Sequence, residues 1–264
     1  MQDRTRLKAA PLRWLWRGLP LLIFGALWHL VSHSGLIDAA FLPDPPSVFA
    51  AFVDLLRGPQ VVDNLGITLF RAFTGLVLGS AAGIWIGMMM ARSEIFRAYI
   101  TPVVGGTYSL PKSALIPLFI LWFGLGSLTA ICAVFLACLL PLIVQTSHGV
   151  QSTPQVLVWS AEAMGYSRRE ILRRIYLPHA LPDIMTGLRI ALGFSFVLAI
   201  SSEMIASTNG IGKLIFMYGE NGAYSYMFVA IAWVVAVAFT ADRCMLLLTA
   251  SILRWHESTV AETA

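Results

Sequence analysis

The feature that constrains the fold most is a series of long apolar segments. Residues 130–144 carry no charged side chain, and residues 184–200 carry only Arg189. A hydrocarbon core of about 30 Å needs roughly 20 apolar residues per helix. Six segments qualify, and they cover approximately residues 14–34, 65–90, 98–123, 127–147, 184–206 and 225–250. Hydrophobic residues make up 58% of the chain and charged residues only 12%. The sequence therefore predicts an all-α integral membrane protein with six transmembrane helices.

The third segment is the least regular of the six. Pro102, Pro111, Lys112 and Pro117 interrupt it. Breaks at membrane depth are tolerated where the backbone is buried in protein or lines a watery cavity. We therefore expect this segment to face the interior of a helix bundle.

The distribution of lysine and arginine predicts the topology. If the N-terminus is cytoplasmic, the cytoplasmic loops are residues 1–17, 91–97, 148–183 and 251–264, and they hold twelve of the 18 basic residues. The opposite loops hold only Arg57 and Lys213. This positive-inside bias predicts a cytoplasmic N-terminal segment (1–17), a transmembrane domain (18–255) and a cytoplasmic tail (256–264). It also accounts for the net charge of +4 without nucleic acid as a partner. No small-residue cleavage site follows the first apolar run, so we expect an uncleaved first span.

Other patterns exclude bound cofactors and metals. Cys132, Cys138 and Cys244 lie in apolar runs without metal-ligand spacing, and the His29/His33 pair has no carboxylate or cysteine beside it. The segment GIGKL, which ends at Leu214, lacks the Ser or Thr and the spacing of a P-loop. We expect no cofactor, no metal and no ATP on this chain.

A row of glycines in the second apolar segment indicates close helix packing. Gly75, Gly79, Gly83 and Gly87 recur at every fourth position. Such a row lets another helix backbone approach, either within the bundle or between two protomers. A lining for substrate is the alternative interpretation.

Residues 150–182 form a charged insert with the local signals of two short helices. Thr153 is placed to cap a first helix, with Pro154 at its first position and Gly165 just past its end. Ser167 opens a capping box with Glu170. We expect Pro178 to end the second helix. The role of the four arginines 168, 169, 173 and 174 could be limited to enforcing the topology and contacting anionic lipid. The ordered helix-bend-helix pattern favours a protein-docking surface.

The sequence resembles the membrane subunits of ABC-type bacterial importers. Gly165, Ile175, Leu177 and Pro178 have the G-x9-I-x-L-P spacing of the EAA loop in that family. Three further stretches are similar to its nitrate, sulfonate and taurine permease branch: FLPDPPSVFAAF from Phe41, PKSALIPLFILWFGLG from Pro111 and SSEMIASTNGIG from Ser201. The resemblance covers roughly residues 40–255.

The resemblance implies a type I ABC importer permease fold in the bacterial inner membrane. It implies that the insert is a coupling loop that docks on a separate ATPase subunit dimer, which binds ATP and Mg²⁺. It further implies a second permease copy, an extracytoplasmic solute-binding protein and a small solute of the nitrate, sulfonate or taurine kind. The coupling-loop candidates are Trp159, Ser160, Ala161, Glu162, Ala163, Met164, Gly165, Tyr166, Ser167 and Pro178.

The chain departs from the family at the position that gives the loop its name. The E-A-A triplet falls on Trp159, Ser160 and Ala161, so the acidic residue is absent. Glu162 lies three residues later, on roughly the same helix face, and could supply the carboxylate. The alternative is a docking surface that fits a divergent ATPase.

Charges inside the apolar segments are functional suspects because their burial is costly. Lys112 and Glu203, with their neighbours Ser113 and Met204, are candidates for the translocation pathway. Lys112 could face an anionic solute, and Glu203 could pair with it or cap broken backbone. Alternatively, Glu203 bonds the following STNG turn and Lys112 has a structural role. Arg189, Asp242 and Arg243 are expected to be interfacial anchors. Two rival functions remain at this point: an ion-gradient-driven secondary transporter and a membrane-embedded enzyme.

Overall fold

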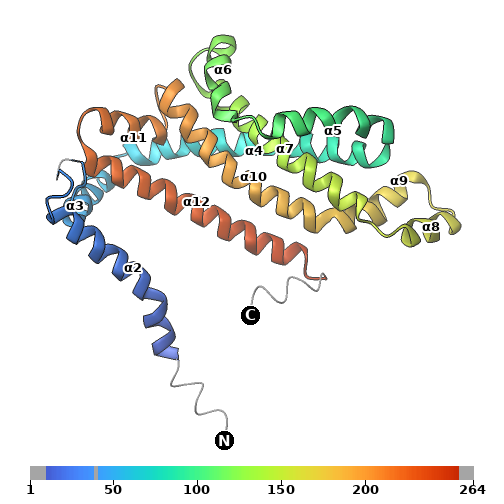
Figure 1. The fold of residues 1–264 in the computed structure, drawn as a ribbon, viewed down its shortest axis with the longest axis horizontal. Coiled ribbons are helices and arrows are strands. Elements are labelled where there is room, and N and C mark those ends of the chain that lie inside the picture. Colours follow the sequence, from blue (N-terminus) through green and yellow to red (C-terminus); the bar gives the residue numbers. More distant parts are fainter. Residues whose placement is uncertain (1–9, 39–40, 256–264) are drawn as a thin grey trace, which may run out of the picture. The chain divides into compact units, whose positions relative to one another are not determined.

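A computed structural model describes residues 10–38 and 41–255, and every regular element within these ranges is a helix (Figure 1). The predicted tail at 256–264 and the first part of the predicted N-terminal segment lie outside the described residues. The chain divides into two compact units, which are described separately. One comprises residues 1–61 and 215–232, and the other residues 62–214 and 233–264.

The first unit contains α2 (Ala10–His33), α3 (Pro45–Leu56), the second half of α11 (Ile211–Glu220) and the start of α12 (Tyr224–Ile252). Pro45 and Pro46 occupy the first turn of α3, where their fixed φ suits a helix and their missing N–H groups cost nothing. The indole Nε1 of Trp28 donates to the carbonyl of Pro43 at 3.1 Å, and its ring stacks on Phe228. These contacts hold the end of α2 against the start of α12.

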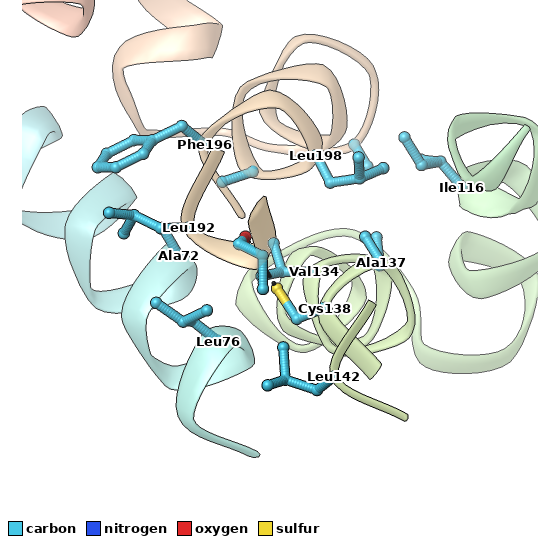
Figure 2. Close-up of a cluster of buried hydrophobic side chains, with 14 residues drawn as sticks. Ala72, Leu76, Ile116, Val134, Ala137, Cys138, Leu142, Leu192, Phe196 and Leu198 are labelled. Carbon is cyan, nitrogen blue, oxygen red and sulfur yellow. Dashed lines mark hydrogen bonds between the residues drawn. The ribbon is translucent and has the colours of Figure 1, made fainter. Parts of the chain in front are cut away.

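The second unit is built around two long helices that pack along one another. These are α7 (Ser127–Gln151) and α10 (Leu177–Ala206) (Figure 1). Figure 2 shows the core between them and α4 (Gln60–Arg92), where apolar side chains from all three helices meet. The buried core residues labelled there include Leu76, Val134, Cys138, Leu142, Leu192 and Phe196.

The glycine row of α4 lies against α7. A Cβ atom added at Gly75 would be 2.6 Å from the Cβ of Val134, and one at Gly83 would be 2.6 Å from the Cβ of Leu142. A Cβ atom added at Gly79 or Gly87 would be 2.6 or 2.8 Å from a backbone carbonyl oxygen of α7. No side chain fits at such distances, so the expectation of helix packing within the bundle is confirmed.

The described helices provide four or five candidate membrane spans. Four helices in the described ranges are long and apolar enough to cross a membrane: α4, α7, the continuous helix Arg168–Ala206, and α12. A fifth span results if α5 (Glu94–Tyr108) is counted together with the η1–α6 segment (Lys112–Phe123), to which it is bent by 93°. The predicted break in the third apolar segment is therefore confirmed. The predicted first span falls in α2, whose apolar part, Leu22–His33, is shorter, and the count of six remains a prediction.

Candidate functional site

The first half of the insert is α8 (Gln155–Ala163), which ends in a glycine turn. Gly165 has φ +77°, a conformation that side chains disfavour. Its N–H donates to the carbonyl of Glu162 at 2.9 Å, and the N–H of Tyr166 donates to the carbonyl of Ala161 at 3.0 Å. These two bonds form a Schellman motif. The predicted position of Gly165, just past the end of the helix, is confirmed.

The second half begins with the predicted capping box. Ser167 is the N-cap of α9 (Arg168–Ile171), and its hydroxyl accepts from the N–H of Glu170 at 3.3 Å. The Glu170 carboxylate in turn accepts from the N–H of Ser167 at 2.9 Å. Between the two helices, the buried Val158, Ala161 and Ile171 form a small apolar cluster. The bend is therefore fixed by hydrogen bonds and by packing.

Two boundary predictions for the insert are wrong. The N-cap of α8 is Pro154, and the hydroxyl of Thr153 is buried without a hydrogen-bond partner among the described residues. Pro178 does not end a helix, because a π-helical turn, η2 (Leu172–Tyr176), runs directly into α10. Hydrogen bonds in a π turn join residues five apart, so the chain can pass a proline that lacks an N–H without stopping.

The helix α8 exposes several large apolar side chains. Trp159 is 63% exposed, and Val156, Leu157 and Met164 are also exposed. Ser160 is exposed, and its hydroxyl donates to the carbonyl of Val156 at 2.8 Å. At the positions of the expected E-A-A triplet, only Ala161 is buried, in the cluster that holds the bend.

Glu162 lines a cavity that two arginines also line. It lines a cavity of about 350 Å³ together with Arg92, from the end of α4, and Arg168, from the start of α9. The carboxylate is exposed, so it is available to a partner or to these arginines.

A buried ion pair lies at the other end of α10. Arg71 of α4 donates from Nη1 to Oε1 of Glu203 at 2.9 Å, and the two residues are 1% and 0% exposed. The Glu203 carboxylate also accepts from the hydroxyl of Thr68 at 2.8 Å and from the N–H of Gly212 at 3.0 Å. Sequence reasoning missed Arg71. The available signal was an arginine inside the apolar segment 65–90.

The remaining donors of Arg71 hold the turn between α10 and α11. Nε donates to Ser127 at 3.0 Å, and Nη1 and Nη2 donate to the backbone and side-chain oxygens of Asn209 at 2.9 and 2.6 Å. Gly210 has φ +107°, and a Cβ there would collide with the Glu203 carboxyl group. The motif STNGIG is thus shaped around the ion pair.

In this geometry the two charged pathway candidates, Glu203 and Lys112, do not contact each other. The carboxylate of Glu203 is fully occupied and does not pair with Lys112, so the alternative in which it bonds the STNG turn fits the structure. Lys112 instead donates from Nζ to the carbonyl of Tyr108 at 2.6 Å and lies 5.2 Å from the centre of the Tyr108 ring. Ser113 is exposed, and Met204 is partly exposed.

Residues 63–254 match the family described as binding-protein-dependent transport system inner membrane component. The chain belongs to this family. Among its relatives is the taurine transport system permease protein TauC of Escherichia coli strain K12, which is 31% identical over 89% of this chain and 88% of the relative. The putative aliphatic sulfonates transport permease protein SsuC of the same organism is 32% identical over 92% of this chain and 94% of the relative.

Solved structures show the same fold for this inner membrane component. A chain of a bacterial alginate ABC transporter, in complex with an alginate-bound periplasmic protein, superposes with a TM-score of 0.65 over 92% of this chain and 97% of that chain, at 17% identity. A chain of the MetNI methionine ABC transporter superposes with a TM-score of 0.60 over 75% of this chain and 95% of that chain, at 19% identity.

The inner membrane component is therefore a multi-pass permease subunit of an ABC importer and has no catalytic role of its own. ATP hydrolysis belongs to a separate subunit. The family assignment favours this function over the ion-gradient-driven transporter and over the membrane-embedded enzyme. Within residues 10–38 and 41–255, no group of three or more His, Cys, Asp or Glu side chains could hold a metal ion.

Proposed function

We propose that two copies of this permease enclose a pathway for a small sulfonate-like organic anion. The names of the relatives, which refer to taurine and aliphatic sulfonates, support this class of cargo. The complex would contain two ATPase subunits that carry ATP and Mg²⁺, with no cofactor on this chain. It would also contain an extracytoplasmic binding protein, since the solved alginate transporter is in complex with a periplasmic protein. Residues 18–255 would form the permease domain in the bilayer, with both chain termini in the cytoplasm.

The observation that carries the proposal is the rigid bend between α8 and α9. A loop that only satisfied the charge rule would need neither a Schellman motif nor a capping box. Both are present, and the bend exposes Val156, Trp159 and Met164 beside it. Exposed apolar patches outside the bilayer mark interaction sites. We therefore assign residues 159–167 to the contact with the ATPase.

The connection to the membrane supports the same role. Because Pro178 does not interrupt the helix, residues 168–206 form one continuous rod from the insert into the second unit's core. A displacement of the insert is thus carried into α10 without a flexible joint. Rigid-body transmission of this kind is a common basis of coupled conformational change.

Trp159 is the better candidate for the central anchor of this contact. Large, exposed aromatic side chains dominate the energetics of protein interfaces. Glu162, by contrast, lines a cavity together with Arg92 and Arg168. In this arrangement the missing acidic residue of the loop is replaced by an apolar contact, and Glu162 contributes at its edge.

The experiment is a substitution at the bend in the assembled complex. Gly165→Val should cost about 1 kcal/mol or more in the positive-φ conformation, even though nothing lies within 4 Å of the added Cβ. We expect substrate-stimulated ATPase activity to fall while membrane insertion stays normal. Gly193→Val in α10 is the matched control, because its Cβ also meets nothing within 4 Å. Unchanged coupling in a correctly inserted Gly165→Val complex would contradict the proposal.

A further inference from the structure

The break between α5 and η1 lies inside a bent helix pair that together is long and apolar enough to form one membrane span. α5 ends at Tyr108, the next helical segment starts at Lys112, and the two axes are bent by 93°. Ser109, Leu110 and Pro111 are all exposed in this chain. Polar backbone that is not buried in protein cannot face lipid, since each unsatisfied group costs several kcal/mol. In this break, which we call the elbow (residues 108–113), the N–H groups of Leu110 and Ala114 donate to backbone carbonyls at 3.2 and 2.9 Å, so the surroundings of the elbow are decided by its charge.

Lys112 carries the charge of the elbow, and its described contacts differ from those of Arg71 and Arg189, two other cations in the apolar segments. Arg71 is paired with Glu203, and Arg189 with Asp242 at 2.7 Å. The described contacts of Lys112 are a backbone carbonyl and an aromatic ring. Neither neutralises its charge. Cations within spans face the bundle interior or a water-filled cavity, so the charge of Lys112 places the elbow on an aqueous surface.

From this arrangement we infer that the elbow is an anion-binding subsite of the translocation pathway. The inference rests on the proposed function and names the residues that would recognise its cargo. The ammonium group of Lys112 and the hydroxyl of Ser113 would bind the oxygens of a sulfonate or a similar oxoanion. The exposed faces of Tyr108 and Leu110 would contact a short carbon chain, since each is 48% exposed.

The chemistry of lysine suits a transient site. An ammonium has three N–H donors, and the carbonyl of Tyr108 accepts from one of them, so an anion can bind without breaking that contact. A single flexible point charge attracts an oxoanion but does not bind it through two parallel hydrogen bonds, as the planar guanidinium of an arginine would. Conduction requires a site that binds the solute strongly enough for the solute to enter and weakly enough for it to leave.

The first test measures water access and electrostatic potential at the elbow. Cys132, Cys138 and Cys244 are replaced by alanine, and Ser113→Cys is introduced into the complete transporter in proteoliposomes. Its labelling rate is compared for anionic and cationic methanethiosulfonate reagents of similar size. We expect both reagents to react and the anionic one to be favoured. Adding Lys112→Gln should lower the anionic-to-cationic rate ratio by roughly tenfold, because charges a few ångströms apart interact strongly at partly dry sites.

The matched control for this test is Arg243→Gln. Arg243 is also a cation over an aromatic ring, 4.7 Å from the centre of Phe239, and its removal should leave the ratio unchanged. Failure of both reagents to label position 113 would overturn the inference. So would a rate ratio that Lys112→Gln does not alter.

The second test separates the subsite from the proposed function. Sulfonate uptake is measured with saturating binding protein, together with basal ATPase activity. We expect Lys112→Gln to lower uptake about tenfold, the loss typical of a charge-assisted hydrogen bond, and Lys112→Arg to retain more uptake. Basal ATPase activity shows that each variant complex is assembled. If the parent complex transports sulfonate and Lys112→Gln transports it equally well, the subsite is wrong. If the parent complex transports no sulfonate but the labelling ratio depends on Lys112, the cargo assignment is wrong and the anion site stands.

Discussion

Arg71 shows how much one residue can organise in an apolar environment. Its side chain reaches Glu203 on α10, Ser127 at the start of α7 and Asn209 in the turn before α11. The glycine at 210 is required because the carboxyl group it faces is held in place by this arginine. A buried ion pair does not guarantee stability, but removing one partner leaves a buried charge uncompensated. We therefore expect the loss of stability on removing Arg71 alone to exceed the net contribution of the ion pair to stability.

We predict that Arg71→Met lowers the free energy of unfolding by about 3–5 kcal/mol. Adding Glu203→Gln to it should recover much of the loss, since the amide oxygen can still accept from Gly212 and no charge remains. The partly exposed pair of Arg189 and Asp242 provides the control, and Arg189→Met should cost no more than about 1 kcal/mol. Reversible unfolding in lipid or mild detergent measures all three. Equal losses for the two arginine variants would show that burial of the Arg71 pair has no special energetic role.

At the scale of elements, the sequence predicted the turns and caps that depend on residues close together in the chain. Gly165 and the Ser167–Glu170 box follow from short-range rules, and both were located correctly. Pro178 was misjudged because the π turn that accommodates it has no sequence signal as clear as proline itself. The partner of Arg71 lies 132 positions away, and only tertiary structure brings Glu203 to it. The glycine row indicated close packing, but the sequence did not identify α7 as the helix it contacts.

The glycine row gives a prediction with a control in the same helix. Gly83→Ala would place a methyl group 2.6 Å from Leu142 and 2.7 Å from the carbonyl of Leu139, so α4 and α7 would have to separate. We expect a loss of about 1–3 kcal/mol, as in other overpacked cores. Gly66→Ala adds the same methyl where nothing lies within 4 Å, and it should stabilise α4 by up to about 1 kcal/mol. Thermal unfolding of the purified variants distinguishes these outcomes. If Gly83→Ala is as stable as the parent, the close approach of the two helices is wrong.

For the whole molecule, the strongest constraint is the asymmetry of its charges. The arginines of the insert occupy the first turns of the continuous helix that ends at Ala206, so they lie within reach of a span end, where the positive-inside rule applies. Arg57 follows α3, at the opposite end of the predicted arrangement. Residues 63–254 carry the family match, and the family assignment fixes the class of protein without fixing which side of the membrane each loop occupies.

The orientation can be tested with two arginine positions that are both exposed, Arg57 and Arg169. In a background without the native cysteines, Arg57→Cys and Arg169→Cys are treated in intact cells with a thiol reagent that does not cross the membrane. The charge bias predicts labelling at position 57 and none at position 169, because twelve of the 18 basic residues lie in the loops assigned to the cytoplasm. Permeabilised cells provide the control, in which both positions should react and so prove that each thiol is accessible. Labelling of position 169 in intact cells would place the insert outside. In that case α8 and α9 could not dock on a cytoplasmic ATPase, and the coupling role proposed for residues 159–167 would fall with the topology.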